Sequence, residues 1–122
     1  MKILVIEDNE TFSLMLCDAL REAGYEVASA PCGKEGVKAA LSFLPDLVLL
    51  DYQLGDMTGY DAALGIRCMR ATAATPFILL SSLADDQLLV SAFKKLPNCR
   101  GALIKNQPLS EVLAAVKTVL AG

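Results

Sequence analysis

The amino-acid sequence predicts an α/β domain in which a five-stranded parallel sheet is covered by helices on both faces. Short aliphatic runs alternate with longer segments whose apolar residues recur at helical spacing. The aliphatic runs are nearly continuous, which is typical of parallel strands buried on both faces. A length of 122 residues suits one domain with a single sheet. Because crossovers between parallel strands are right-handed, a doubly wound sheet is the expected architecture.

The first half of the chain contains three predicted strands separated by two predicted helices. Apolar residues at helical spacing over 12–23 are followed by Gly24, and those over 37–44 by Pro45, which are both helix stop signals. The second strand is the most polar of the three, so we expect it near an edge of the sheet. The predicted strands are residues 2–7 (KILVIE), 25–30 (YEVASA) and 46–50 (DLVLL).

The second half continues the alternation with three helices and two strands. A helix is expected from about Tyr60 to about Met69, after a glycine-containing loop. Further helical stripes run over residues 88–96 and 109–120. The remaining strands are residues 76–81 (PFILLS) and 101–105 (GALIK). The chain has no linker-like, repetitive or low-complexity segment, so we expect one domain over residues 1–122.

Composition argues against several classes of protein. With 54% hydrophobic and 20% charged residues, disorder is not expected. The net charge is −3 and basic residues are scattered, so this domain is not expected to bind nucleic acid directly. Without a signal-peptide pattern or a bilayer-length apolar segment, we expect a cytoplasmic protein with no membrane partner. The four cysteines form no CxxC pair and histidine is absent, so free thiols are expected.

Polar or charged residues stand at the carboxyl ends of four of the five predicted strands, as the last residue of the strand or directly after it. Because the carboxyl ends of parallel strands lie at one edge of a sheet, these side chains should meet although they are distant in sequence. Ligands of doubly wound sheets bind at this edge. The residues concerned are Glu7 and Asp8, Asp51, Ser81 and Ser82, and Lys105.

This combination of side chains suits a metal-assisted phosphoryl site. Three neighbouring carboxylates repel one another unless a cation is present, and an all-oxygen set favours a hard ion such as Mg²⁺. Lysine and serine can bind phosphoryl oxygens, and a carboxylate can carry an aspartyl phosphate. Taken singly, each residue has an ordinary structural explanation, and only the joint pattern favours a site. Turn or helix-capping roles are expected for Asp46, Asp56, Asp61, Asp85 and Asp86.

The segments that carry these residues resemble the receiver domain of two-component response regulators. They are VIEDN, LVLLD, GDMTG, PFILLSS and ALIK, in family order and at family spacing over essentially the whole chain. The resemblance implies that residues 1–122 form one receiver domain. It also implies a flavodoxin-like sheet with strand order 2-1-3-4-5.

The same resemblance implies a role for each site residue. Asp51 takes the place of the phosphoacceptor, and Glu7 and Asp8 that of the acidic pair which holds Mg²⁺ together with Asp51. The backbone carbonyl of Gln53 is implied as a further metal ligand. Ser81 and Lys105 take the places of the hydroxyl and ammonium groups that bind the phosphoryl group, with Ser82 in the neighbouring small-residue position.

The implied function is that of a signalling switch rather than a turnover enzyme. A phosphoryl group would pass from a phosphohistidine on a sensor histidine kinase or phosphotransfer protein to Asp51, and the domain would catalyse only its own phosphorylation and dephosphorylation. In the family this changes a surface formed by helix four, strand five and helix five. A downstream protein or a fused output domain recognises that surface.

Four positions depart from the family pattern. Asn106 replaces the proline that usually follows Lys105, so we expect a trans peptide bond there or a cis bond under strain. Ala102 replaces the aromatic residue that usually couples to the site, so ring-based coupling is not expected. Gly55 replaces a loop proline and should loosen the segment after Asp51. Leu83 cannot orient water by hydrogen bonding, which predicts a long-lived phosphoryl group.

Other functions account less well for the sequence. A pseudo-receiver, a phosphorylation-independent interaction module, is compatible with Asn106 and Ala102 but not with the intact acidic and basic set. A phosphohydrolase of the haloacid-dehalogenase type would need a second aspartate where Gln53 stands. A nucleotide or flavin site would need a glycine-rich phosphate loop, and the segment after the first strand, EDNETF, has none.

Overall fold

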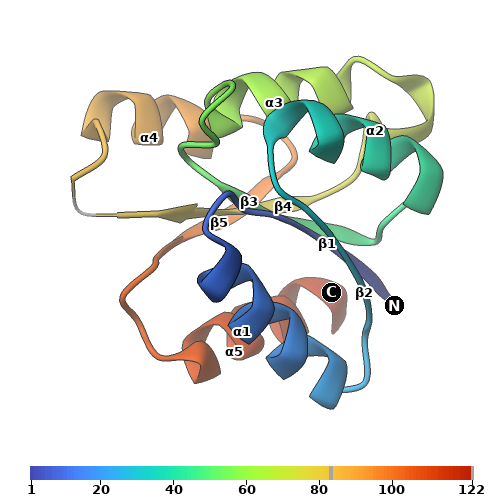
Figure 1. Ribbon diagram of the computed structural model, residues 1–122. Helices are drawn as coiled ribbons and strands as arrows, with labels where there is room; N and C mark the ends of the chain where they lie inside the picture. The colour runs from blue at the N-terminus through green and yellow to red at the C-terminus, as the bar shows by residue number, and fades with distance from the viewer. Residues whose placement is uncertain (83, 122) are drawn as a thin grey trace.

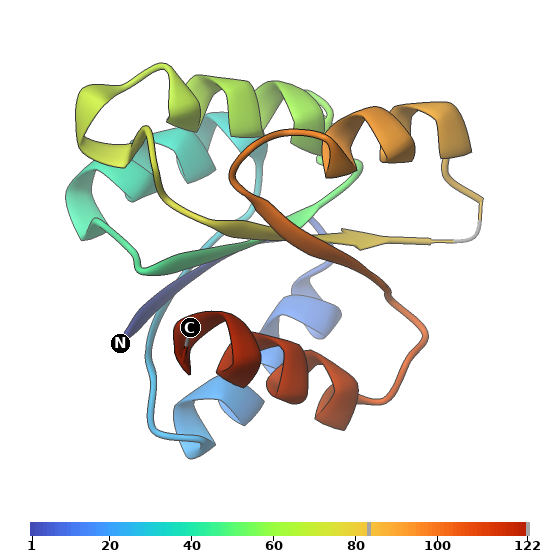
Figure 2. The same cartoon turned by 180° about the vertical axis from the view of Figure 1, so that it is seen from behind.

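Five parallel strands form the middle layer of the structure, a computed structural model that describes residues 1–82 and 84–121. Their order is β2-β1-β3-β4-β5, which confirms the predicted doubly wound topology and places the polar second strand at an edge. Figures 1 and 2 show the sheet between two layers of helices. The strands are β1 (Lys2–Ile6), β2 (Glu26–Ala30), β3 (Leu47–Asp51), β4 (Phe77–Ser81) and β5 (Cys99–Ile104).

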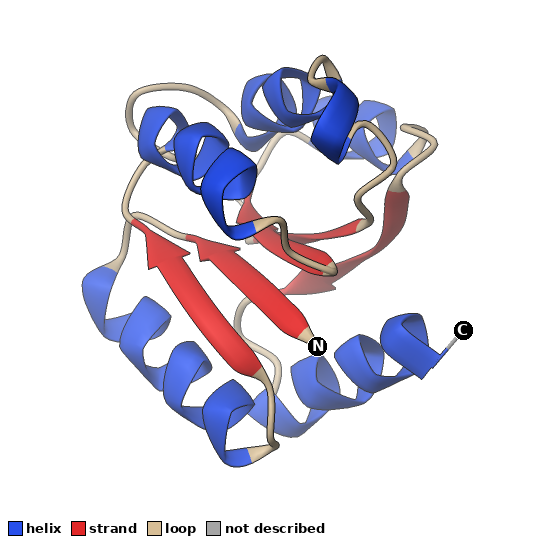
Figure 3. Cartoon of the chain, turned by 90° about the vertical axis from the view of Figure 1, so that its right-hand side faces the viewer, coloured by secondary structure: helices blue, strands red, loops and turns tan. Residues whose placement is uncertain are grey.

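Helices cover both faces of this sheet, as the continuous aliphatic strands require (Figure 3). One layer contains α1 (Glu10–Glu22) and α5 (Leu109–Ala121), and the other contains α2 (Gly33–Phe43), α3 (Gly59–Arg67) and α4 (Gln87–Lys94). A short 3₁₀ turn, η1 (Arg70–Thr72), follows α3. Among the described residues, no helix combines the length and apolar character that a membrane crossing needs.

Each face of the sheet packs its own hydrophobic core because neighbouring strand residues point to opposite faces. Leu4 and Ile6 of β1 belong to the core beneath α2, α3 and α4, where Phe93 is fully buried. Ile3 and Val5 belong to the core beneath α1 and α5. Strands β1, β3 and β4 are therefore buried on both sides along their apolar lengths.

Side-chain caps fix where several helices begin. The Asn9 side chain accepts a hydrogen bond from the Phe12 N–H at the start of α1. The Asp86 carboxylate accepts from the Leu88 N–H at the start of α4, which confirms its predicted capping role. Asp56 accepts from the backbone N–H groups of Gly33 and Lys34, so it caps α2 from the loop after β3.

Element boundaries differ from the predictions at several points. Strand β5 begins two residues earlier than expected and ends before Lys105, and α3 ends at Arg67 rather than near Met69. The helix stop signals act as predicted, with Gly24 at φ +99° after α1 and α2 ending before Pro45. The Lys105–Asn106 peptide bond is trans, one of the two expected alternatives. Leu83, with its predicted effect on phosphoryl lifetime, lies outside the described residues.

The four cysteines, all within the described residues, are free thiols as predicted.

The end of β3 is held by a close backbone approach at Gly59. The Gly59 N–H donates to the Tyr52 carbonyl oxygen at 2.6 Å. A Cβ atom at Gly59 would overlap the backbone carbonyl oxygen of Asp51, which is not a flexible group and cannot move aside cheaply. Glycine is therefore required here for α3 to start directly beside the last residue of β3.

We expect Gly59→Ala to lower the free energy of unfolding by about 1–3 kcal/mol, because the added methyl group must displace backbone atoms at the end of β3. Urea denaturation followed by circular dichroism measures this change.

Gly65→Ala in the same helix is the matched control, since its Cβ would lie 3.3 Å from a side-chain methyl group of Val37 rather than against backbone, and alanine favours helix. Equal stabilities of the two variants would contradict the assigned role of Gly59.

Candidate functional site

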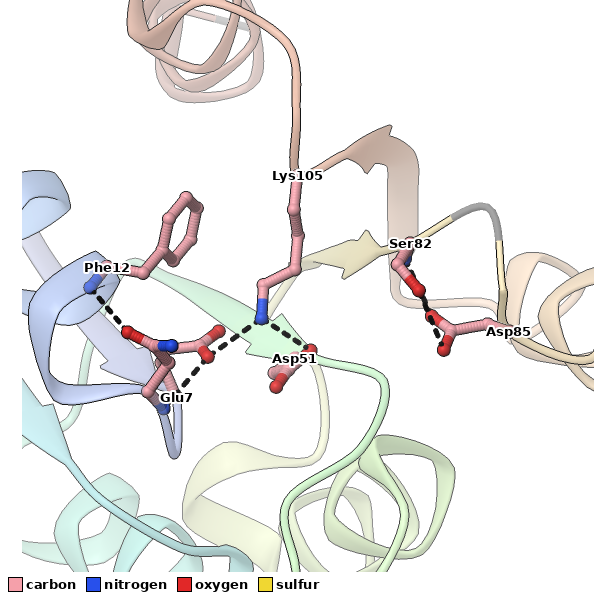
Figure 4. A network of polar contacts seen from close by, with 7 residues as sticks. Glu7, Phe12, Asp51, Ser82, Asp85 and Lys105 are labelled. Carbon is pink, nitrogen blue, oxygen red and sulfur yellow. Dashed lines mark hydrogen bonds and ion pairs between the residues drawn. The ribbon is translucent and has the colours of Figure 1, made fainter.

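The charged residues predicted to meet do so at the carboxyl edge of the sheet. Asp51 is the last residue of β3, Glu7 directly follows β1, and Lys105 directly follows β5. The Lys105 ammonium donates to Glu7 Oε1 at 2.8 Å and lies 3.2 Å from Asp51 Oδ1 (Figure 4). Both carboxylates are almost fully buried, with 2% and 4% residue exposure. One lysine therefore forms ion pairs with two buried carboxylates at the ends of different strands.

Two further contacts hold Lys105 in this position. Its ammonium lies 5.0 Å from the centroid of the Phe12 ring, within cation–π range. Its backbone N–H donates to the Ser81 carbonyl oxygen at 2.8 Å, which joins the end of β5 to β4. Phe12 was not predicted as a site residue, because in the sequence it is indistinguishable from the other apolar residues of the helical stripe.

The turn after Lys105 is closed by a glutamine. The Gln107 N–H donates to the Ile104 carbonyl oxygen, and the Gln107 side-chain oxygen accepts from the Ile104 N–H. These two bonds close the turn around Asn106, the position at which the resemblance to receiver domains implied a proline. Lys105 nevertheless lies beside Glu7 and Asp51.

Glu7, Asp8 and Asp51 offer carboxylate oxygens that lie within 4.8 Å of one another. Glu7 Oε2 is buried and has no hydrogen-bond partner in the part of the chain that the structure describes, which costs free energy unless another group binds there. Lys105 supplies one positive charge to three neighbouring carboxylates, so the cluster is short of positive charge. An all-oxygen donor set with these properties fits a hard divalent cation such as Mg²⁺.

Burial and the neighbouring charges shift the pKa values of both Asp51 and Lys105. The pKa of Asp51 is raised from 3.8 to about 7, first by burial and then by the charge of Glu7, against the lowering effect of Lys105. Burial alone would lower the pKa of Lys105, but its hydrogen bond to Glu7 and the charges of Glu7 and Asp51 raise it. Lys105 thus keeps its proton, and Asp51 is held near the midpoint of its titration at neutral pH.

An open cleft of about 400 Å³ gives access to these groups. Its floor contains Asp51 and Lys105, and exposed Asp8 and Gln53 stand at its margin. A donor molecule can therefore approach the Asp51 carboxylate from solvent. The lining residues are Asp8, Asn9, Asp51, Gln53, Ser82, Asp85 and Lys105.

The two predicted serines lie differently in this cleft. Ser81 is the last residue of β4, is 2% exposed, and is not among the lining residues. Ser82 is half-buried and lines the cleft. Asp85 also lines it, although the sequence suggested only a turn or helix-capping role. The predicted end of β4 at Ser81 is correct, and Ser82, the first residue after the strand, is the serine that lines the cleft.

Comparison with known proteins supports the resemblance to receiver domains. The family model described as the response regulator receiver domain matches residues 3–117. The chain is 32% identical over 121 residues to the transcriptional regulatory protein CusR of Escherichia coli K12, and 30% identical over 119 residues to the DNA-binding dual master transcriptional regulator RpaA of Synechocystis. These matches cover 98% of the chain but only 51% and 48% of the two relatives, so the chain spans about half their length.

A solved structure with a similar fold is the receiver domain of the sensor histidine kinase PA1611 from Pseudomonas aeruginosa. The TM-score is 0.86 at 25% sequence identity, and the match covers 99% of this chain and 98% of the other. That structure has a magnesium ion coordinated in its active site cleft.

We expect Asp51→Asn to stabilise the protein in magnesium-free buffer at pH 8 by on the order of 3 kcal/mol. The raised pKa means that the folded chain binds the Asp51 proton more tightly than the unfolded chain. The corresponding stability is present below about pH 3.8 and is lost as the pH rises through about 7. Urea denaturation between pH 4 and pH 8 measures the profile.

The exposed Asp61 provides the control, and Asp61→Asn should follow the wild-type pH profile. If Asp51→Asn is no more stable than the wild type at pH 8, the electrostatic account of the site is wrong.

Proposed function

Because the chain belongs to the response regulator receiver domain family, we propose that it is a phosphoacceptor switch of a two-component system. In this proposal, residues 1–122 act as one receiver domain and Asp51 accepts a phosphoryl group from a phosphohistidine. The donor is a sensor histidine kinase or a phosphotransfer protein. The domain promotes only its own phosphorylation and dephosphorylation and is not a turnover enzyme.

The observation that carries the proposal is the Lys105 ammonium bridging Glu7 and Asp51 at the floor of an open cleft. A carboxylate nucleophile must be accessible and ionised, and a neighbouring cation favours the ionised form. An Asp51 oxygen attacks phosphorus while the bond from phosphorus to the histidine nitrogen breaks. The nitrogen keeps that electron pair, so the products are an acyl phosphate and a free imidazole.

The charge that develops during this transfer gives a role to the other polar residues at the carboxyl edge of the sheet. The transferring group carries negative charge on its three outer oxygens, so catalysis depends on positioning and on fixed positive charge. Lys105 is 3.2 Å from the acceptor carboxylate and can follow the phosphoryl oxygens without a large movement. Ser81 is the predicted hydroxyl ligand, and Ser82 is the serine with direct access to the cleft.

Magnesium is the proposed cofactor, and it would supply the positive charge that Lys105 alone does not provide. Glu7, Asp8 and Asp51 would hold it through their carboxylates, with the backbone carbonyl of Gln53 as a further ligand. The unpartnered Glu7 Oε2 and the closeness of the three carboxylates support this assignment.

Phosphorylation would be transmitted through the loops that follow β4 and β5. The acyl phosphate adds charge at the rim and attracts Lys105, whose backbone is bonded to Ser81. We propose that a downstream protein or a fused output domain responds to the surface of α4, β5 and α5. The named relatives are transcriptional regulators about twice as long as this chain, which supports a DNA-binding output. The proposed location is the cytoplasm.

A pseudo-receiver is the second candidate, and Asn106 is the residue that favours it. The trans turn closed by Gln107 replaces the usual proline after Lys105. The turn nevertheless keeps the Lys105 ammonium on Asp51, which is the contact that phosphorylation needs.

Incubation with Mg²⁺ and a small acyl-phosphate donor tests the proposal. We expect the intact mass of the wild type to increase by one phosphoryl group, only in the presence of Mg²⁺. Asp51→Asn should remain unmodified because it lacks the nucleophile, and Lys105→Met should react on the order of a hundredfold more slowly because it lacks the fixed charge.

Lys95→Met, which removes an exposed lysine distant from the cleft, serves as the matched control and should react at the wild-type rate. A wild type that gains no mass, or an Asp51→Asn variant that gains as much as the wild type, would favour the pseudo-receiver.

A further inference from the structure

Asp85 binds both hydrogen-bond donors of the serine that lines the cleft. The Ser82 backbone N–H donates to Asp85 Oδ2 at 2.7 Å, and the Ser82 hydroxyl lies 3.3 Å from Asp85 Oδ1 (Figure 4). The Asp85 N–H donates back to the Ser82 carbonyl oxygen at 3.2 Å. Both residues line the same cleft as Asp51 and Lys105. In the unmodified protein, the Ser82 donors are therefore engaged by an internal anion.

Asp85 and its neighbour Asp86 perform different tasks. Asp86 is exposed and caps α4 through Leu88, and it does not line the cleft. Asp85 is half-buried and is directed to Ser82. The helix start is thus secured without Asp85, so a capping role does not explain why a third carboxylate lies in a cleft that already contains Asp8 and Asp51.

We propose that Asp85 is a positioning residue that occupies the Ser82 donors until a phosphoryl group on Asp51 displaces it. This inference rests on the proposed phosphoacceptor function. A carboxylate that accepts one N–H and one O–H bond presents the same pair of anionic oxygens that a phosphoryl group would present. The two anions compete for one set of donors, so the free energy of the Ser82–Asp85 contact is subtracted from that of phosphoryl binding.

Displacement of Asp85 also has a route to α4. A phosphoryl group adds negative charge to the cleft and repels a carboxylate at its edge. Asp85 is joined directly to Asp86, the residue that caps α4. Release of Asp85 from Ser82 therefore changes the constraint on the first turn of that helix.

Binding of beryllofluoride with Mg²⁺, a phosphoryl mimic, tests the competition. We expect Asp85→Ala to bind the mimic about tenfold more tightly than the wild type, because no internal charged acceptor has to leave Ser82. Asp85→Asn, which keeps the shape but loses the charge, should give a smaller gain. Affinities are measured by NMR titration, and the Ser82 amide resonance is followed in the same spectra.

Asp86→Asn is the matched control. It removes one charge from the same loop while asparagine still caps the helix, so its affinity should stay within about twofold of the wild type. The gain of Asp85→Ala should persist at high salt, because the effect comes from a hydrogen-bonded contact. A gain that is shared by Asp86→Asn, or that disappears with salt, would indicate simple charge repulsion and overturn the proposal.

Two other outcomes separate this inference from the proposed function. If the wild type binds the mimic through Asp51 and all Asp85 variants bind equally, the competition is wrong and the phosphoacceptor function stands. If the wild type binds no mimic, both are wrong. The Ser82 amide resonance is also compared in the absence of the mimic. If it is the same in the wild type and in Asp85→Ala, the Ser82–Asp85 contact is absent in solution and the inference is overturned.

Discussion

The ammonium group of Lys105, shared by the buried carboxylates of Glu7 and Asp51, is the interaction on which the rest of the site depends. Burying two acids is costly unless a cation compensates them, and one lysine compensates them only in part. Burial and, after it, the charge of Glu7 raise the pKa of Asp51 to about 7, and Glu7 Oε2 has no hydrogen-bond partner among residues 1–82 and 84–121. A divalent cation at Glu7, Asp8 and Asp51 would relieve both effects.

The fold makes this costly arrangement possible by fixing the strands that carry it. Strands β1 and β3 pair in register along aliphatic residues that are buried on both faces. Their ends cannot shift without moving two cores, so Glu7 and Asp51 stay at the edge even though their charges repel. Gly59 adds a local constraint by bringing α3 against the Asp51 backbone. The packing of the two cores thus compensates the unfavourable electrostatics of Glu7 and Asp51 at the edge of the sheet.

Much of this organisation follows from the sequence, because hydrophobic periodicity and parallel topology together determine which strand ends meet. The edge position of β2 and the meeting of Glu7, Asp51 and Lys105 were predictable on this basis, whereas the full strand order was implied only by the resemblance to receiver domains. Contacts set by the path of a loop were not. Asp85 and Asp86 are adjacent and chemically identical, and only the three-dimensional course of the loop directs one to Ser82 and the other to α4. The role of Phe12 depends likewise on the rotation of α1.

The central claim is that Lys105 does not fully compensate the carboxylates of Glu7, Asp8 and Asp51, and that the pKa of buried Asp51 is raised in this environment. An NMR titration of the Asp51 side-chain carboxyl carbon, with and without Mg²⁺, tests it most directly. The account predicts a pKa of about 7 in the absence of Mg²⁺. It also predicts a decrease of at least about one unit when Mg²⁺ binds. An Asp51 pKa near 3.8 that does not respond to Mg²⁺ would contradict the account.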